Sequence, residues 1–250
     1  MTSSSYTTEQ GDYTVAPAGP CLSYSLHHPT TAIQNAVSKA AIIAHPYGRL
    51  GGCKEDHVVV ALAGMLASGG WTVLTYDARG SGSSTGSVSW SSRAEAKDYE
   101  SMLREVLLPA VLPPAAAGDV KPQKVSLLLA GYSYGSLAAS ACPPPAETAD
   151  VCYETSYLLV SYPLSVVWAL CALQTSYFVS ALDKHSQTHC VLAVNGDQDQ
   201  FTAVEKFRSW STGLADSDRF QAVEITGADH FWRQRDKKAA LLSAIHNWIT

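Results

Sequence analysis

The strongest chemical signal in the sequence is a serine held between two glycines, in the stretch Gly131-Tyr132-Ser133-Tyr134-Gly135. An apolar run (127–130) comes directly before it, and small residues typical of a helix (136–141) follow. A sharp turn from strand to helix crowds its neighbours, so flanking glycines give the backbone room for close approach. The turn would hold the hydroxyl above the sheet, at a helix start whose dipole favours negative charge. The pattern predicts that Ser133 is a nucleophile; the alternative is a helix cap in a glycine-rich loop.

A serine hydroxyl needs a base within hydrogen-bond reach to attack a carbonyl carbon. Where the serine follows a strand in this way, the acid and then the histidine come later in the chain, each after a strand. The sequence has 8 histidines, and His230 is the one in the loop after the last predicted strand. We therefore predict His230 as the base, with an ordinary surface histidine as the alternative.

Two aspartates compete for the role of the acid. Asp199 lies far enough past the preceding strand to turn back toward the imidazole, where it would select one tautomer. Asp197 lies closer to the strand and could instead accept hydrogen bonds from backbone amides. Asp199 is preferred, and Asp229 is interpreted as shaping the loop of His230.

Acyl chemistry also needs two N–H groups directed at the developing oxyanion. Tyr134, the residue after the nucleophile, supplies one, and the loop His45-Pro46-Tyr47 after an earlier strand supplies the other. Proline has no N–H, so Tyr47 is the predicted donor. This loop is also a tight connection to the next helix, and both interpretations can hold together.

The elements that must position these residues alternate between short apolar runs and amphipathic stretches. This alternation predicts an α/β fold with a mostly parallel central sheet and helices on both faces. A possible antiparallel edge strand at 21–26 precedes six predicted strands, at 40–44, 71–76, 124–130, 156–161, 190–194 and 220–225. No internal repeat and no domain-sized change of composition occurs, so a single domain (1–250) is expected.

Helical spacing of apolar residues predicts helices at 58–66, which the glycines at 69–70 end, and at 241–249. Ser92 and Glu95 resemble a capping box that opens a helix running to about Leu108. Pro109 should end this helix, and a linker should follow to Gly118.

The composition restricts the compartment and the partners. The 250-residue chain is 46% hydrophobic and 16% charged, with a formal net charge of −5, which disfavours nucleic acid and anionic membrane as main partners. The first residues are polar and show no secretory signal, so 1–15 is expected to be flexible and the location cytoplasmic.

The 6 cysteines are expected to be reduced. The pair His185 and His189 lacks further ligands, so no metal is expected, and no nucleotide or flavin fingerprint is found.

Five stretches together resemble the α/β-hydrolase superfamily: A-H-P-Y-G-R-L-G-G, Y-D-A-R-G-S-G-S-S-T-G, G-Y-S-Y-G, N-G-D-Q-D and G-A-D-H-F. More narrowly, they are similar to small, nearly lidless serine hydrolases like dienelactone-hydrolase and acyl-peptidase-type domains. The resemblance runs from about residue 40 to the C-terminus. It implies a triad of Ser133, Asp199 and His230, with the oxyanion amides at Tyr47 and Tyr134. It also implies that Asp77 and Arg79 are structural.

The predicted function is hydrolysis of a carboxylic ester, thioester or lactone of a small molecule. The same triad could instead serve an acyltransferase or a cyclising or C–C-bond enzyme of small-molecule biosynthesis, and a non-catalytic binding module is a further alternative. The segment 162–188 is too short for a separate cap domain and predicts a short cap-like helical segment. Trp168, Tyr177, Phe178 and Phe231 are the candidate substrate-binding residues, with core packing as the alternative for at least half of them.

Overall fold

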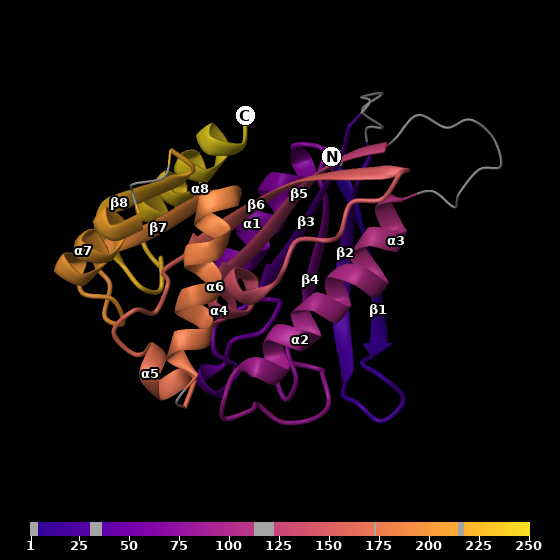
Figure 1. Ribbon diagram of the computed structural model, residues 1–250, viewed down its shortest axis with the longest axis horizontal. Helices are drawn as coiled ribbons and strands as arrows, with labels where there is room; N and C mark the ends of the chain where they lie inside the picture. Colours follow the sequence, from indigo (N-terminus) through magenta and orange to yellow (C-terminus); the bar gives the residue numbers. More distant parts are fainter. Residues whose placement is uncertain (1–4, 31–36, 113–122, 173, 215–217) are drawn as a thin grey trace.

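A computed structural model describes residues 5–30, 37–112, 123–172, 174–214 and 218–250. Its strands form one eight-stranded sheet in the order β1-β2-β4-β3-β5-β6-β7-β8 (Figure 1). The strands are β1 (Tyr6–Thr14), β2 (Cys21–Pro29), β3 (Val37–Ala44), β4 (Thr72–Tyr76), β5 (Gln123–Tyr132), β6 (Val151–Val160), β7 (Cys190–Gln198) and β8 (Phe220–Asp229).

The strands from β4 through β3 and β5 to β8 run parallel, whereas β1 and β2 are joined to them in antiparallel fashion. The carboxyl ends of the parallel strands therefore meet at one edge of the sheet, where ligands bind in folds of this kind. All six predicted parallel strands are found within or overlapping these elements. The fold class is thus the α/β class that the sequence predicts.

The N-terminal segment differs from the prediction. Residues 1–15 were expected to be flexible, but Tyr6–Thr14 pairs with β2 along its whole length, from Tyr6 opposite Pro29 to Thr14 opposite Cys21. The strand is mostly exposed and polar, so it lacks the apolar alternation by which a buried strand is recognised. As a result β2, expected at the edge, lies inside the sheet.

Apolar side chains of each parallel strand point alternately into two cores, one on each face of the sheet. Ala40, Ile42 and Ala44 of β3 belong to one core, and Ala41 and Ile43 belong to the other. Every one of these side chains is buried, as expected for strands covered on both faces.

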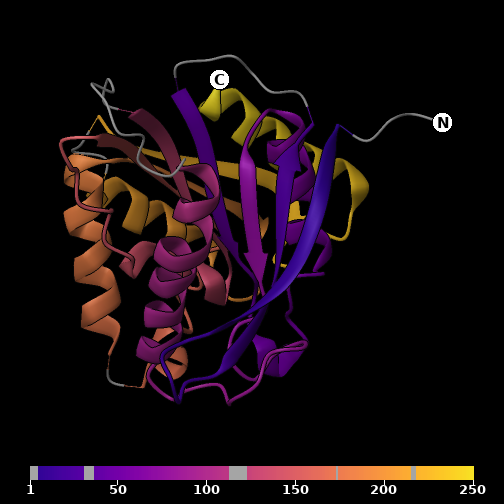
Figure 2. The same cartoon turned by 90° about the vertical axis from the view of Figure 1, so that its right-hand side faces the viewer.

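Helices form a layer on each side of the sheet, which Figure 2 shows edge-on. Residues of α1 (His57–Ser68) and α8 (Arg235–Ile249) fill one core. Residues of α2 (Arg93–Met102), α4 (Tyr134–Ala141), α6 (Thr175–Thr188) and α7 (Val204–Leu214) fill the other. The short α5 (Val167–Leu170) and the 3₁₀ turn η1 (Gly48–Leu50) lie in the loops after β6 and β3.

The predicted capping box at Ser92 is wrong. Ser92 has a φ of 58°, and its hydroxyl donates to the carbonyl of Leu170, 2.8 Å away, in place of capping α2. Glu95 accepts hydrogen bonds from the amide and hydroxyl of Ser89. Both side chains are therefore used to bind neighbouring loops together, which local sequence spacing does not reveal.

The helix also continues past Pro109. A π-helical turn, Leu103–Leu107 (η2), precedes a last turn of α-helix, Leu108–Val111 (α3), that contains the proline. Proline lacks an N–H and crowds the carbonyl four residues earlier, and a widened turn relieves both effects. Residues 113–118 of the predicted linker lie outside the described part of the chain.

The segment 162–188 is largely a sheet-covering helix and only partly cap-like. Phe178 and Leu182 of α6 are buried in the same core as Leu137 of α4, so α6 packs on the sheet layer. In the part of the chain that the structure describes, no helix is long and apolar enough to cross a membrane.

Candidate active site

Ser133 occupies the turn between β5 and α4. Its backbone has a φ of 55° and a ψ of −120°, a strained conformation for a residue with a β-carbon. A β-carbon on Gly131 would overlap the carbonyl of Gly135, and one on Gly135 would overlap the carbonyl of Ala44. The two glycines therefore allow the close approach that the sequence pattern predicts. The Ser133 amide donates to the carbonyl of Val160, 2.8 Å away, which ties the turn to β6.

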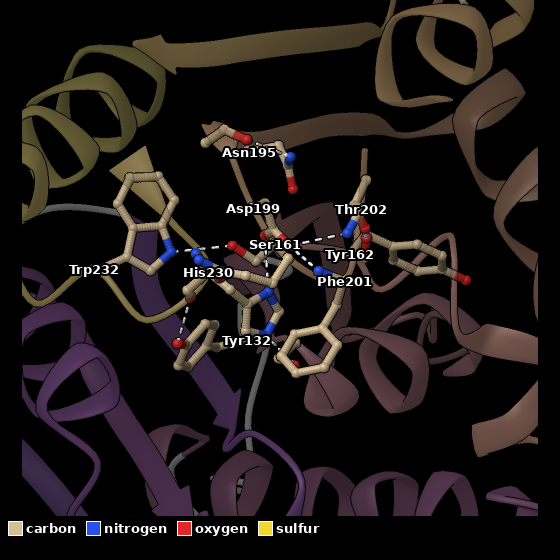
Figure 3. Close-up of polar contacts among 12 residues, drawn as sticks. Tyr132, Ser161, Tyr162, Asn195, Asp199, Phe201, Thr202, His230 and Trp232 are labelled. Atoms are coloured by element: carbon tan, nitrogen blue, oxygen red, sulfur yellow. Dashed lines mark hydrogen bonds and ion pairs between the residues drawn. The ribbon is translucent and has the colours of Figure 1, made fainter. Parts of the chain in front are cut away.

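Three predicted residues from three different loops form one hydrogen-bonded chain. His230 Nε2 lies 2.8 Å from Ser133 Oγ. His230 Nδ1 lies 2.8 Å from Asp199 Oδ2 (Figure 3). The Asp199 side chain is fully buried and the His230 side chain is 4% exposed. With Nδ1 donating to the carboxylate, Nε2 is free to accept the serine proton.

The other oxygen of Asp199 is held by the backbone. Asp199 Oδ1 accepts hydrogen bonds from the amides of Phe201 (2.8 Å) and Thr202 (2.9 Å), so the carboxylate is fixed in position. Asp197 Oδ1 accepts from the amide of Gly227 at 2.6 Å and takes no part in the chain. The two aspartates are thus placed as the preferred interpretation of the sequence has them.

The loop of His230 is attached at three further points, none of which the sequence indicated. The Tyr132 hydroxyl donates to the His230 carbonyl at 2.7 Å, and the His230 amide donates to Gln200 Oε1 at 3.1 Å. Trp232 Nε1 donates to the hydroxyl of Ser161 at 3.0 Å (Figure 3). These contacts hold the imidazole in its orientation from β5, β6 and the loop after β7.

Both predicted oxyanion residues lie beside Ser133. Tyr134 is the first residue of α4, so its N–H has no acceptor within the helix. Tyr47 follows β3 and lines the same pocket as Ser133, and the Tyr47 and Tyr134 rings lie 4.9 Å apart between centroids.

His45 anchors the loop that carries Tyr47. Its Nδ1 donates to the carbonyl of Pro46 at 2.5 Å, and its Nε2 accepts from the amide of Ala78 at 2.9 Å. Burial lowers the pKa of His45, which favours the neutral ring that this pattern requires.

Asp77 and Arg79 order the neighbouring loop, as the resemblance implies. Asp77 Oδ2 forms a buried ion pair with Lys54 Nζ at 3.0 Å, and its Oδ1 accepts from the Lys54 amide at 2.8 Å. Arg79 binds the buried carboxylate of Asp98 through two hydrogen bonds of 2.6 Å. These pairs are placed beneath the loops and not in the pocket.

A pocket of about 220 Å³ opens above Ser133 and His230. Its apolar wall consists of Pro46, Tyr47, Leu50, Tyr132, Pro163, Val166, Leu170, Phe201 and Phe231, and its polar part includes Asp56, His57 and Arg233. An apolar pocket with a few polar groups is the usual form of a small-molecule site.

Of the four candidate substrate-binding residues, only Phe231 lines this pocket. Phe178 is fully buried in the core under α6, whereas Trp168 and Tyr177 are exposed at the surface, by 70% and 37%. The prediction fails for these three because Phe178 faces the core, whereas Trp168 and Tyr177 face the surface and do not line the pocket. Phe201, which the sequence analysis missed, lies 4.5 Å from the His230 ring, and its position two residues after Asp199 was the available signal.

His185 and His189 lie far from this site and have structural surroundings. The ring of His185 stacks on Tyr157 at 4.8 Å, and the His189 ring lies 5.9 Å from the same tyrosine. Burial lowers the pKa of His185 to about 4. Among the described residues, no cluster of three or more His, Cys, Asp or Glu side chains could hold a metal ion.

Comparison with known proteins identifies the fold. No protein-family model and no curated protein matches the chain, but solved structures match along nearly its full length. An α/β serine hydrolase homologue from Coxiella burnetii is 20% identical, with a TM-score of 0.68 over 96% of this chain and 97% of that one. A serine hydrolase without a lid from Xanthomonas campestris is 20% identical, with a TM-score of 0.63 over 96% and 95%. Alpha/beta hydrolase domain-containing protein 10 from mouse is 18% identical, with a TM-score of 0.61 over 96% and 98%. The chain has the α/β-hydrolase fold.

Proposed function

We propose that this protein is a serine hydrolase that cleaves a carboxylic ester, thioester or lactone of a small molecule through an acyl-enzyme on Ser133. The observation that carries the proposal is the unbroken hydrogen-bonded chain from Ser133 through His230 to Asp199. A binding module would have no need for a strained serine beside a buried histidine and carboxylate. Similarity to solved serine hydrolases supports the same machinery.

The reaction would begin when Ser133 Oγ attacks the acyl carbon and passes its proton to His230 Nε2. Asp199 stabilises the imidazolium that forms, and the amides of Tyr47 and Tyr134 bind the negative oxygen of the tetrahedral intermediate. His230 then returns the proton to the leaving group, and the acyl-enzyme remains. A water molecule activated by the same histidine would release the acid and restore Ser133.

The pocket supports hydrolysis over transfer to a second nucleophile. Acyl transfer requires that water be kept away from the acyl-enzyme. Here the rim residue Leu50 is 73% exposed, and the pocket is open to solvent above Ser133. The apolar wall beside the nucleophile fits a substrate with an apolar acyl group.

The test is the intact mass of the protein after incubation with a fluorophosphonate. We expect a single adduct on the wild type and none on Ser133→Ala, because the reagent requires an activated serine. Ser140→Ala is the matched control, since Ser140 is a buried serine of the same helix whose hydroxyl donates to the Leu137 carbonyl. Its adduct should form as on the wild type.

A folded wild-type protein that forms no adduct would contradict the proposal and favour the non-catalytic module. If the adduct forms, a panel of p-nitrophenyl esters, thioesters and lactones would identify the substrate class. Transfer of the acyl group to an added amine or alcohol in preference to water would favour the acyltransferase alternative.

A further inference from the structure

Large apolar side chains project from the molecule around the entrance of the pocket. Five large hydrophobic side chains are exposed in the described chain, and four of them come from loops or helix starts at the carboxyl edge of the sheet. In Figure 1 the beginning of α2, α5 and the beginning of α6 lie together at the lower edge. We define the mouth face as these four residues and three accompanying arginines: Leu50, Trp90, Trp168, Tyr177, Arg49, Arg93 and Arg233.

The three arginines all stack on aromatic rings. The guanidinium of Arg49 lies 5.2 Å from the Trp90 ring centroid, and that of Arg93 lies 4.4 Å from the Tyr177 ring. Arg233 lies 4.7 Å from the ring of Phe231, which lines the pocket. Stacking covers the plane of a guanidinium and leaves its N–H edge available to an anion.

None of these three arginines has a carboxylate within ion-pair distance among the described residues. In contrast, three arginines elsewhere are paired with acids, namely Arg79, Arg104 and Arg208. The edges of the mouth-face arginines instead meet neutral groups, the Val88 carbonyl for Arg49 and Gln174 Oε1 for Arg93. These three guanidinium groups therefore carry charge that no described carboxylate neutralises in an ion pair.

Three acids of the same loops are turned inward. Asp77, Glu95 and Asp98 are buried, and each is bound by a partner described above. Glu55, Asp56, Glu205 and Asp236 also lie in loops or helix starts at this edge, and none of them forms an ion pair with a mouth-face arginine. The net charge of −5 belongs to the whole chain and does not describe this face.

The mouth face is continuous, because hydrogen bonds and ring contacts join its segments. Arg49 connects η1 to the loop of Trp90, and the Ser92 hydroxyl binds the Leu170 carbonyl in α5 at 2.8 Å. Arg93 then reaches the start of α6 through Tyr177. Leu50 and Leu170 line the pocket, so the face leads directly to Ser133.

We propose that the mouth face docks on a lipid surface that carries anionic head groups. Tryptophan and leucine partition into the interfacial layer of a membrane, and arginine edges bind phosphate groups. Trp90 and Trp168 are 78% and 70% exposed and do not line the pocket, so they fit an extended surface and not a small ligand. Docking in this way presents lipid-embedded esters to the pocket, but the binding itself does not depend on the chemistry of Ser133.

The experiment is co-sedimentation with vesicles, in a Ser133→Ala background so that no lipid is consumed. Vesicles of phosphatidylcholine with phosphatidylglycerol should bind the protein more tightly than vesicles of phosphatidylcholine alone. Raising the salt to about 0.5 M should weaken the binding. Changing Arg49, Arg93 or Arg233 to Gln should each weaken it about fivefold, and the double variant Trp90→Ser with Trp168→Ser should weaken it about tenfold or more.

Two control substitutions lie outside the mouth face. Val60→Ser changes the fifth exposed hydrophobic side chain, which lies on α1, and Arg104→Gln changes an arginine paired with Glu100. Both should bind vesicles as the parent does. Circular dichroism and thermal unfolding show that each variant is folded, and neither measurement depends on the proposed catalysis.

Failure to bind anionic vesicles, or equal binding by the double tryptophan variant, would overturn the proposal. So would a dimer in light scattering that the tryptophan changes dissociate, because a second copy of the chain would then cover this face.

Discussion

Asp197 lies near the end of β7 and Asp199 directly follows the strand, and the two carboxylates have different partners. Asp199 accepts His230 Nδ1–H and two backbone amides, whereas Asp197 accepts the amide of Gly227. The sequence favoured Asp199 through its distance from the strand end, and it left Asp197 open. The decision depends on where β8 ends relative to β7, which a single sequence does not specify.

Exchanging these two carboxylates for amides separates their roles. Asp199→Asn should lower kcat/KM roughly 10⁴-fold, because the amide no longer favours the Nδ1–H tautomer of His230. Asp197→Asn should change it by less than about threefold, since an amide oxygen can still accept the Gly227 N–H. Steady-state kinetics on an activated ester measures both. A similar loss in the two variants would place the acid role elsewhere.

Pocket residues were harder to predict than the triad. The longest aromatic-rich segment suggested Trp168, Tyr177 and Phe178, but a side chain on a helix faces the pocket only if the helix is rotated toward it. The observed wall comes instead from loop residues such as Phe201 and Leu50. The proposed triad residues can be predicted from their side-chain chemistry and their order in the chain. Pocket residues depend on how the helices and loops pack, which the sequence does not state.

At the scale of elements, buried strands were predictable and locally unusual features were not. Apolar runs identified β3 to β8, because strands covered on both faces are rich in apolar residues; β8, at the edge of the sheet, is only partly buried. The polar edge strand β1, the Ser92 contact with Leu170 and the π-helical turn before Pro109 all depend on neighbours distant in sequence or on strain relief. The spacing of neighbouring residues in the sequence reveals neither the distant contacts nor the strain.

The contact between the start of α4 and the end of β3 brings the two proposed oxyanion amides together. Gly135→Ala would place a β-carbon against the Ala44 carbonyl and push the loop of Tyr47 away from Ser133. We expect kcat/KM to fall roughly 10²-fold, the usual loss for one oxyanion donor. Stability should fall by about 1 to 3 kcal/mol from overpacking.

Gly213→Ala is the matched control, because Gly213 lies in α7 and a β-carbon there meets nothing within 4 Å. It should raise stability by about 0.5 to 1 kcal/mol, since alanine favours helix, and leave activity unchanged. Kinetics and thermal unfolding distinguish the two variants. Full activity in Gly135→Ala would show that this contact does not position the Tyr47 amide beside Ser133.

At the scale of the whole molecule, the chemistry gathers at the carboxyl edge, while a buried pH-sensitive group lies elsewhere. His185 on α6 stacks on Tyr157, and burial lowers its pKa to about 4 from an ordinary 6.5. The unfolded chain therefore binds this proton at a higher pH than the folded one. The stability that the neutral His185 contributes is fully present above pH 6.5 and is lost as the pH falls toward 4.

The expected loss over this window is about 3 kcal/mol, from a shift of roughly two and a half pH units. His185→Phe keeps a ring against Tyr157 and removes the titrating group, so its stability should vary less between pH 6.5 and 4. His246→Phe, at an exposed position on α8, should keep the wild-type dependence of the unfolding free energy on pH. Urea unfolding at a series of pH values tests this. If the unfolding free energy of His185→Phe changed with pH as that of the wild type does, other groups would cause the pH dependence.

The backbone at residue 133 also bears on the history of the protein. A φ of 55° with a ψ of −120° suits glycine, and a residue with a β-carbon holds it at a cost of about 1 to 3 kcal/mol. Selection for a stable fold alone would favour glycine at this position. If Ser133 is the proposed nucleophile, selection for the reactivity of its hydroxyl group accounts for a serine at this position in spite of that cost.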